Sequence, residues 1–321
     1  MIIVRSPLRF SFFGGGTDIP EYYKKDYGCV LGQAINKYVY VILNKRFEKN
    51  IRLSYMKNEL VTNVRQIKHS LIRESFQEFG ISNGIELVTV ADIPGTGTGL
   101  GSSSSLTVSL CNSLSLFLEK HLEKSDIAKI SCKIEIQKVK SPIGKQDQYI
   151  STFGGILFLK FEKDENVIVE KLNLNSNTKK DLEQNIMAFY TGLHRQTNTI
   201  LKKQIKRTKL NLKPLDQIRA IAEEGRDCLR NDDLSSFSLL FNKSWELKKT
   251  LSPNISNSVI DSIYNKGMKA GALGGKISGA GGGGFVFFYC EPRYQKRLRE
   301  SLKHFKELQF QIDYSGTIQL H

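Results

Sequence analysis

Apolar positions alternate, or recur at helical spacing, in short segments along the chain. In the first half, the apolar run within residues 30–47 predicts a strand, and residues 51–55 alternate as its expected hairpin partner. The pattern then predicts a helix over 67–79, a strand over 85–91, helices over 102–118 and 126–139, and a second hairpin over 155–161 and 167–174. The first half therefore mixes strands and helices.

The second half has a different pattern. It predicts a strand over 186–191, a helical stretch broken by Pro214 and ending near residue 250, a glycine-dense segment over 267–284, a strand over 285–290, a helix over 292–305 and a final strand over 310–314. Strands separated by helices and closed by hairpins indicate an α+β fold with helices on one face of the sheets. The polar segment 175–185 marks a boundary, so we expect domains over residues 1–180 and 181–321.

Composition restricts the class of protein and its partners. Of the 321 residues, 40% are hydrophobic and 25% are charged, which is typical of a folded protein. A net charge of +15 points to an anionic partner, either nucleic acid, an anionic membrane surface or a small anionic substrate. The basic run 202–213 is interpreted as a solvated helix face, with a phosphate-binding patch as the alternative. Cysteines without C-x-x-C spacing, and apolar runs too short for a signal peptide or a membrane span, predict a cytoplasmic protein.

The most informative segment is PGTGTGLGSSSS at residues 94–105. Its glycines free the backbone to turn tightly and approach a ligand, and a helical pattern follows directly. A glycine loop before a helix gathers unpaired N–H groups at the positive end of the helix dipole, which attracts phosphate. The segment lacks the lysine of a Walker A motif and the spacing of a dinucleotide fingerprint. A serine-rich helix cap after a flexible turn is the alternative interpretation.

Three further segments carry candidate chemistry, each with a structural alternative. In GGGTD, Asp18 follows a glycine turn and either accepts hydrogen bonds from sugar hydroxyls or caps the turn. In SPIGKQDQY, Asp147 either faces a substrate hydroxyl or caps a helix. In KISGAGGGGFVFFY, the glycines 281–284 either form a second wall of a phosphate site or pack tightly against another backbone.

Glu135 is a fifth candidate, on the predicted helix 126–139. Magnesium ligation is one interpretation, because Mg²⁺ prefers one or two carboxylates together with nucleotide phosphates. The alternative is a surface salt bridge with Lys129, Lys133 or Lys138, which are close in sequence.

Taken in order, these segments resemble the GHMP small-molecule kinases. RSPLRFSFFGGGTD, PGTGTGLGSSSS and KISGAGGGGF match the family motifs over nearly the whole chain, and GGGTD with IGKQDQY and FGGI resembles its sugar-1-kinase branch. The resemblance implies an N-terminal domain like the second domain of ribosomal protein S5. It also implies a ferredoxin-like C-terminal domain, with the active site in the cleft between the two.

The resemblance also implies a role for each matching residue. The loop that wraps the phosphates of ATP would comprise Pro94, Gly95, Gly97, Gly99, Leu100, Gly101, Ser102, Ser103 and Ser104. Ser103 or Ser104 would lie near Mg²⁺, with Glu135 as the helix-borne ligand. Asp147 would lie beside the acceptor hydroxyl, and Arg9 would pair with it and offset transferred charge. The acceptor would contact Asp18, Gly15, Gly16, Thr17, Lys145, Arg195, Gly281 and Gly282.

The acceptor implied by the resemblance is a heptose 7-phosphate, phosphorylated at its anomeric hydroxyl. Galactokinase has Glu-His where this chain has Gly15-Gly16, which argues against galactose. Lys145 and Arg195 are the candidates for holding the second phosphate. Another sugar such as fucose, an RNA-binding protein of S5-like fold and a kinase-like scaffold without catalysis are the alternatives. The expected partners are ATP and a sugar phosphate, without nucleic acid or membrane, and the oligomeric state is open, a homodimer included.

Overall fold

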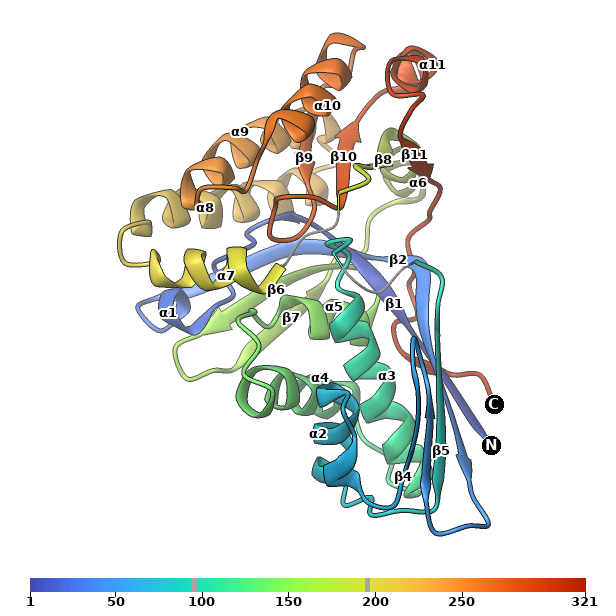
Figure 1. The fold of residues 1–321 in the computed structure, drawn as a ribbon. Helices are drawn as coiled ribbons and strands as arrows, with labels where there is room; N and C mark the ends of the chain where they lie inside the picture. The colour runs from blue at the N-terminus through green and yellow to red at the C-terminus, as the bar shows by residue number, and fades with distance from the viewer. Residues whose placement is uncertain (94–96, 194–196) are drawn as a thin grey trace.

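The computed structural model describes residues 1–93, 97–193 and 197–321. Two sheets meet near the middle of the molecule, and helices pack against both of them (Figure 1). In the first half the elements are β1 (Ile2–Phe13), α1 (Pro20–Tyr23), β2 (Tyr27–Lys45), β3 (Ile51–Ser54), β4 (Asn58–Val61), η1 (Val64–Gln66), α2 (Ser70–Glu78), β5 (Ile85–Ala91), α3 (Ser102–Phe117), α4 (Lys124–Cys132), η2 (Lys133–Lys138), α5 (Gln146–Phe153), β6 (Ile156–Glu162) and β7 (Val167–Lys171).

The first sheet has the order β12-β1-β2-β5-β3-β4, and β6 joins it on β2 and carries β7. The strand predicted over 85–91 and the hairpin of β6 and β7 are confirmed. The prediction that residues 51–55 pair with the long strand before them is wrong, because β5 lies between them. β3 instead pairs in parallel with β5 and antiparallel with β4. The short turn suggested a hairpin, but the intervening strand comes from later in the chain.

Helix α3 lies against β1 through small polar side chains. Ser105 Oγ donates to the Pro7 carbonyl oxygen at 2.8 Å, and Ser109 Oγ donates to Ser6 Oγ at 2.7 Å. Ser151 of α5 also donates to the Pro7 carbonyl oxygen, at 2.6 Å. These buried serines have their hydrogen bonds satisfied, so the helix can approach the strand closely without an unpaired polar group. The contact fixes the N-terminus of α3 relative to β1.

In the second half the elements are α6 (Ser176–Asn185), β8 (Ile186–Tyr190), α7 (Thr197–Lys206), α8 (Leu212–Arg230), α9 (Leu234–Leu251), α10 (Ser258–Lys269), β9 (Gly274–Ile277), β10 (Phe285–Tyr289), α11 (Pro292–Ser301), β11 (Lys306–Leu308) and β12 (Ile318–Gln319). The second sheet is antiparallel with the order β11-β8-β10-β9. Along the chain this is the fourth, first, third and second strand, with helices between the first and second and between the third and fourth. This arrangement is ferredoxin-like.

One helix in this half was not predicted, and one predicted strand is wrong. The polar segment 175–185, where the domain boundary is expected, contains the helix α6, begun by Asn175, whose side chain accepts a hydrogen bond from the Thr178 N–H. Residues 310–314 do not form a strand and make only an isolated bridge, between Ile312 and Ile35. The last strands are the short β11 and β12, and β12 returns to pair with β1.

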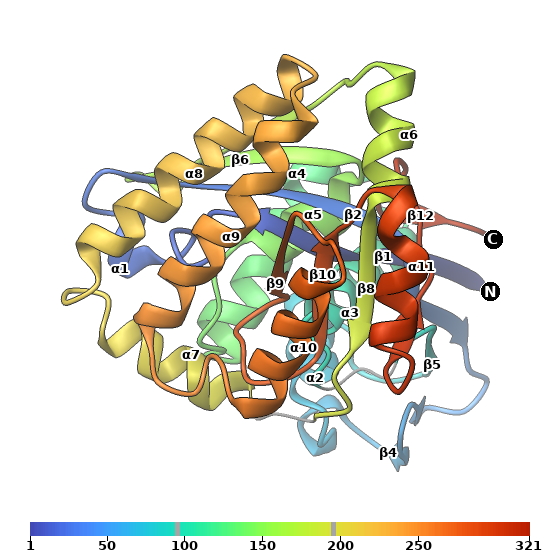
Figure 2. The same cartoon turned by 90° about the horizontal axis from the view of Figure 1, so that it is seen from above.

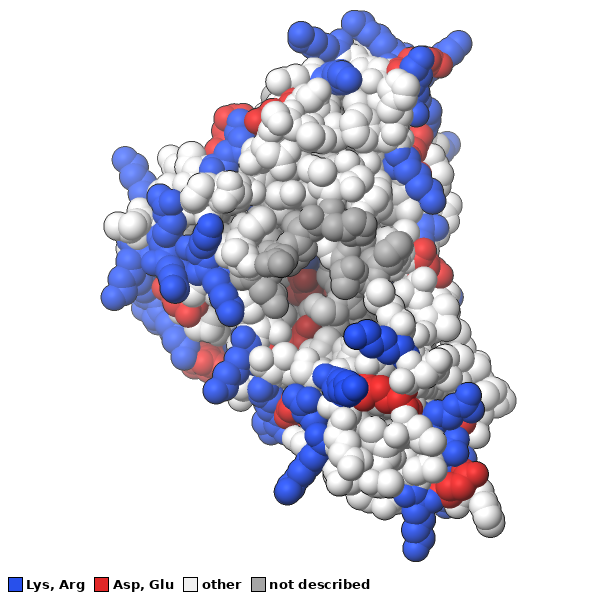
Figure 3. Space-filling model, in the orientation of Figure 1, with Lys and Arg blue, Asp and Glu red and all other residues white. Residues whose placement is uncertain are grey.

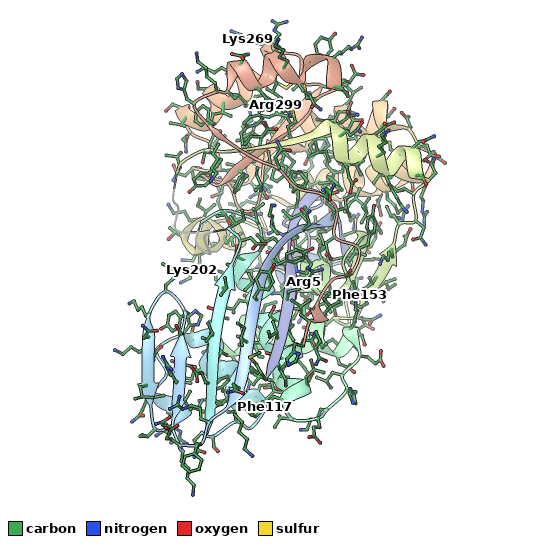
Figure 4. The ribbon with its side chains drawn as sticks, turned by 90° about the vertical axis from the view of Figure 1, so that its right-hand side faces the viewer. Arg5, Phe117, Phe153, Lys202, Lys269 and Arg299 are labelled. Atoms are coloured by element: carbon green, nitrogen blue, oxygen red, sulfur yellow. The ribbon has the colours of Figure 1, made fainter. Side chains whose placement is uncertain are left out.

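An aromatic cluster joins the two sheets. Phe10 of β1 stacks on Phe287 of β10 with ring centroids 3.5 Å apart, and Phe12 and Phe13 contact Phe237 of α9. Helices α8 and α9 lie side by side over this junction in the view from above (Figure 2), and α8 packs on β1 and β2. Figure 4 shows Lys202 of α7 at the level where the sheets meet, between Phe117 at the end of α3 and Lys269 at the end of α10. No helix in the described ranges is both long and apolar enough to cross a bilayer.

Candidate active site

A cavity of about 530 Å³ opens where the two sheets meet. Figure 3 shows this hollow with acidic side chains inside it and Lys and Arg side chains gathered on the α7 side. The described residues that line it come from β1, the GGGTD turn, the glycine loop, α3, α5, α7, α9, β9 and the turn after β9. The sequence segments that carry candidate chemistry therefore meet in one place.

Arg9 and Asp147 form a two-pronged ion pair at the centre of this cavity. Arg9 Nε donates to Asp147 Oδ1 and Nη2 donates to Oδ2, both at 2.6 Å. Nη1 donates to the Gly99 carbonyl oxygen at 2.5 Å. Asp147 is in the first turn of α5, and its side chain is 18% exposed while that of Arg9 is 6% exposed. Bidentate pairing fixes the orientation of the carboxylate, so the structure brings together the two residues predicted to be catalytic.

The glycine loop forms the wall next to this pair. Gly97, Gly99, Gly101, Ser102 and Ser103 line the cavity, together with Thr98. Gly101 begins α3 in the left-handed conformation, with φ of 78°. A Cβ on Gly101 would lie 3.1 Å from Arg9 Cγ and 3.3 Å from Asp147 Oδ2. Both the left-handed backbone conformation and the lack of room for a side chain therefore favour glycine at this position.

The other predicted loop residues have different places. Leu100 and Ser104 are buried and do not line the cavity. The Leu100 carbonyl oxygen accepts a hydrogen bond from the Arg9 N–H at 2.9 Å, which ties the loop to β1. Pro94 and Gly95 lie outside the described residues.

In the glycine segment 279–284, Gly281 and Gly282 pack against neighbouring backbone rather than facing the cavity. Gly281 and Gly282, predicted to bind substrate, are absent from the lining, where Gly279 and Ala280 occur. A Cβ on Gly281 would lie 2.7 Å from Ile255, and the Gly282 N–H donates to the Ile255 carbonyl oxygen at 2.7 Å. Their positions correspond to the tight-packing alternative. Ser278 Oγ donates to the Gly99 carbonyl oxygen at 2.7 Å, so the turn after β9 holds the glycine loop.

Asp18 lines the cavity together with Gly15 and Gly16. Its Oδ1 accepts from the Gly16 N–H at 3.0 Å, and its Oδ2 accepts from Gln146 Nε2 at 2.9 Å. Burial raises the pKa of Asp18, and the charge of Asp147 raises it further. Asp18 therefore caps the turn, as the structural alternative predicted, and also lines the cavity; its contact with a sugar stays a prediction.

Thr17, between Gly16 and Asp18, has a structural position. Its hydroxyl donates to the Gly14 and Cys29 carbonyl oxygens at 2.8 Å, and the residue is fully buried. It does not line the cavity, so its contribution is to shape the turn that carries Asp18.

Glu135 is buried behind the serines of the glycine loop. It lies in η2, a π-helical segment that continues α4, and such segments are frequent at functional sites. Burial raises the pKa of Glu135 to about 7, although the Ser104, Gln148 and Ser103 side chains favour its charged form. Gln148 Nε2 donates to Glu135 Oε2 at 2.5 Å.

The surface-salt-bridge interpretation of Glu135 does not hold. Lys133 and Lys138 pair with Glu78 instead. Their side chains therefore point away from Glu135, which is 1% exposed. A buried carboxylate beside the phosphate loop favours the functional interpretation.

Lys145, predicted to bind substrate, does not line the cavity. Its ammonium group donates to the Glu165 carbonyl oxygen at 3.1 Å, lies 3.6 Å from the Glu165 carboxylate and 5.0 Å from the centre of the Tyr23 ring. These contacts hold the Lys145 side chain against Glu165 and Tyr23, away from the cavity lining. Arg195, the second candidate for an acceptor phosphate, lies outside the described residues.

Sequence reasoning missed several polar groups in the cavity wall, notably Lys276, Lys248, Gln146, Ser11 and Gln204. Lys276 Nζ donates to the Ser11 and Phe12 carbonyl oxygens, the latter at 2.5 Å, where the pairing of β1 with β2 is irregular. Burial lowers the pKa of Lys276 well below its usual value, and the charges of Lys248 and Arg9 add to the effect. The sequence signal that could have identified Lys276 is its position directly before the ISGAGGGG segment.

Comparison with known proteins relates this chain to one family of kinases. The model of the GHMP kinases N terminal domain matches residues 63–155, and that of the GHMP kinases C terminal domain matches residues 226–307. A D-glycero-alpha-D-manno-heptose 7-phosphate kinase of Campylobacter jejuni is 32% identical, over 98% of this chain and 96% of its own length. An L-fucokinase/L-fucose-1-P guanylyltransferase of Bacteroides fragilis is 26% identical over 93% of this chain, which spans 35% of that protein.

Among solved structures, a D-glycero-D-manno-heptose 1-phosphate kinase of Bacteroides thetaiotaomicron superposes with a TM-score of 0.84. The match covers 100% of this chain and 99% of the other. At 22% identity, this similarity supports a shared fold only. The two-domain fold predicted from the motifs is therefore confirmed. With family models on both halves and a relative aligned along nearly its whole length, the chain belongs to the GHMP kinase family.

Proposed function

We propose that this protein is an ATP-dependent sugar 1-kinase. It transfers the γ-phosphoryl group of ATP to the anomeric hydroxyl of D-glycero-D-manno-heptose 7-phosphate and yields the 1,7-bisphosphate. The acceptor is inferred from the Campylobacter jejuni relative, which is similar over almost the full chain. The observation that carries the reaction type is the Arg9–Asp147 pair, held against the glycine loop in the same cavity as Asp18.

Arg9 and Asp147 have different roles at the reacting atoms. The anomeric oxygen attacks the γ-phosphorus, the bond to the β-phosphate oxygen breaks, and ADP leaves. Asp147 orients the attacking hydroxyl and accepts its proton. The Arg9 guanidinium holds that carboxylate in place and offsets negative charge on the transferring group.

The glycine loop and the start of α3 bind the triphosphate. Backbone N–H groups at a helix N-terminus, together with the helix dipole, favour phosphate oxygens. Lys248 adds positive charge from the C-terminal domain side of the cavity, which Lys276 also lines. Asp18 accepts hydrogen bonds from the sugar.

The residues behind the loop fit Mg²⁺. Ser103 lines the cavity, and the Glu135 carboxylate lies behind it. The Ser104 hydroxyl is buried near this carboxylate, but its geometry falls short of a full hydrogen bond. These are hard oxygen donors, which Mg²⁺ prefers together with water and phosphate oxygens. Within the described ranges no three His, Cys, Asp or Glu side chains cluster as a metal site, so the protein would supply few ligands. When bound, Mg²⁺ neutralises phosphate charge.

A coupled assay of ADP release across four acceptors tests the proposal. We expect the highest kcat/KM with heptose 7-phosphate, compared with fucose, galactose and mevalonate. Asp147→Asn should lower kcat by about 10²-fold or more and leave the affinity for ATP within about twofold, because only proton acceptance and orientation are lost. A preference for fucose would replace the proposed acceptor. Near-normal turnover of Asp147→Asn would remove Asp147 from its role.

A further inference from the structure

Gln204 is a buried polar side chain to which the proposed reaction gives no part. It lies on α7, lines the cavity and is 7% exposed. Its backbone carbonyl oxygen accepts from Thr208 Oγ1 at 3.4 Å. Across the part of the chain that the structure describes, its side-chain amide has no hydrogen-bond partner. The amide atoms are not closed off from the cavity, so a ligand that enters it can satisfy their hydrogen-bonding capacity.

The surroundings of Gln204 leave the cavity as the source of such a partner. A Cβ on Gly16 would lie 2.6 Å from Gln204 Nε2, so the amide rests directly on the Gly16 backbone. On the protein side, Leu215 and Leu251 lie close to the same point, at 3.4 and 3.9 Å from that Cβ position. Apolar side chains offer no hydrogen bonds. Gly16, with φ of 103°, gives the amide room that any side chain would take.

A series of contacts places Gln204 on the acceptor side of the cavity. Asp147 lies against the glycine loop, and its neighbour Gln146 donates to Asp18 at 2.9 Å. Asp18 accepts from the Gly16 N–H at 3.0 Å, and Gly16 touches Gln204. Gln204 therefore ends a row of groups that begins at the reacting centre and leads away from the nucleotide loop.

Gln204 differs from the other amide in this row. Gln146 accepts from Ser11 Oγ at 2.5 Å and donates to Asp18, so both ends of its side chain are engaged. Gln204 retains two donors and one acceptor. A group that can donate and accept at once matches hydroxyls, which also do both, better than it matches a phosphate, which only accepts.

We propose that Gln204 is a specificity-determining residue that hydrogen-bonds hydroxyl groups of the acceptor sugar away from the carbon that is phosphorylated. The inference rests on the proposed kinase function and adds to it a recognition group from the C-terminal domain. A site built to hydrogen-bond a hydroxyl discriminates strongly against analogues that lack it, since its own polar group is then left unpaired.

The first test compares Gln204→Leu with the wild type. Leucine has a similar size but makes no hydrogen bonds, so KM for heptose 7-phosphate should rise about 10-fold or more, with KM for ATP within about twofold. The matched control is Lys203→Leu, one residue earlier on the same helix, where the side chain is exposed. It should leave both KM values unchanged. An unchanged acceptor KM in Gln204→Leu overturns the proposal.

A second readout separates direct recognition from a structural role. Wild type and Gln204→Leu are compared on heptose 7-phosphates that each lack one hydroxyl. If Gln204 reads a hydroxyl, the analogue without it is a poor substrate for the wild type, and the variant loses nothing further on that analogue. Equal losses on every analogue would indicate a general disturbance of the cavity and would overturn the proposal.

Failure of the proposed function gives a different result. If the wild type prefers another sugar, the same comparison with that sugar tests Gln204. If it phosphorylates no acceptor, the kinase proposal fails, and calorimetric titration of heptose 7-phosphate into both proteins decides the inference. Binding weakened about 10-fold in Gln204→Leu supports it, and equal binding or absence of binding by the wild type overturns it.

Discussion

At the scale of single residues, the site consists of side chains that hold one another in place. Arg9 uses all three guanidinium nitrogens, two on Asp147 and one on the Gly99 carbonyl oxygen. Gln146 likewise joins Ser11 to Asp18. Because these groups are oriented by the fold, little reorganisation is needed when substrates arrive, and geometry of this kind supplies much of the rate of phosphoryl transfer.

Lys276 gives a prediction of pH dependence. Its folded-state pKa is lowered well below 10.5 by burial, so between that lowered value and 10.5 the unfolded chain binds more protons than the folded one. Stability then rises with pH over this interval, and below it the cost of the buried charge is constant. Urea unfolding of wild type and Lys276→Met from pH 7 to 10 should show the wild type gaining stability relative to the variant.

The comparison isolates the charge from the hydrogen bonds. The variant loses the bonds to the Ser11 and Phe12 carbonyl oxygens at every pH, which shifts the whole curve but not its slope. A difference in stability that stays flat from pH 7 to 10 would mean that Lys276 is not held in the way the structure indicates. Lys249→Met, at a partly exposed lysine of α9, provides the control.

At the scale of elements, chain segments with strong local signals were predictable and those set by distant contacts were not. The strand 85–91 and helix α3 follow from periodicity and from the glycine loop before the helix. Helix α6 was missed because its sequence is mostly polar, and a cap at Asn175 rather than an apolar face begins it. The pairing of β3 with β5 has no local signal either, since β5 comes much later in the chain.

The same contrast holds for the site. Arg9, Asp18 and Asp147 could be predicted because each lies within a recognisable motif. Lys276 and Gln204 could not, because their roles depend on where the irregular stretch of β1 and helix α7 lie in space. Gly281 and Gly282 were assigned to the wrong wall, since a run of glycines does not show which of its members faces a cavity.

The N-terminus of α3 supports a second prediction. Gly101→Ala and Gly84→Ala both place a side chain at positive φ, 78° and 70°, at a cost of about 1–2 kcal/mol in stability. At Gly84 the new Cβ meets nothing within 4 Å, whereas at Gly101 it meets Arg9 and Asp147. Both variants should lose similar stability in thermal unfolding, but only Gly101→Ala should lose kcat/KM, by about 10-fold or more. Equal activity in the two variants would contradict this reading of the site.

At the scale of the whole molecule, the two sheets are parts of one structure. Phe10 on the first sheet stacks on Phe287 of the second, and the last residues of the chain return to the first. The Ile3 N–H donates to the His321 carbonyl oxygen at 2.8 Å, and Tyr38 Oη donates to Asp313 at 2.9 Å. The Arg9–Asp147 pair lies on β1 and α5, close to this junction, so its geometry depends on both halves.

Removal of the returning segment tests this coupling. A chain ending at Phe310 loses β12 and the Asp313 contacts, so its single thermal transition should fall by more than about 5 °C and both halves should unfold together. Differential scanning calorimetry shows whether the chain unfolds in one transition or in two. Leu320→Gln, at a side chain that is 47% exposed, is the control and should leave the midpoint in place. Two separate transitions in the wild type would show that the halves are independent.

The pairing of β1 with β12 has a consequence for the order of folding. Of the described elements β1 is synthesised before all others and β12 after them, so the outer edge of β1 stays unpaired until every element between them has been made. Contacts between such distant segments are slow to form, and an unpaired strand edge invites association with other chains meanwhile. The strand that carries Arg9 is thus made before the other described elements, and this edge of it is paired only after all of them.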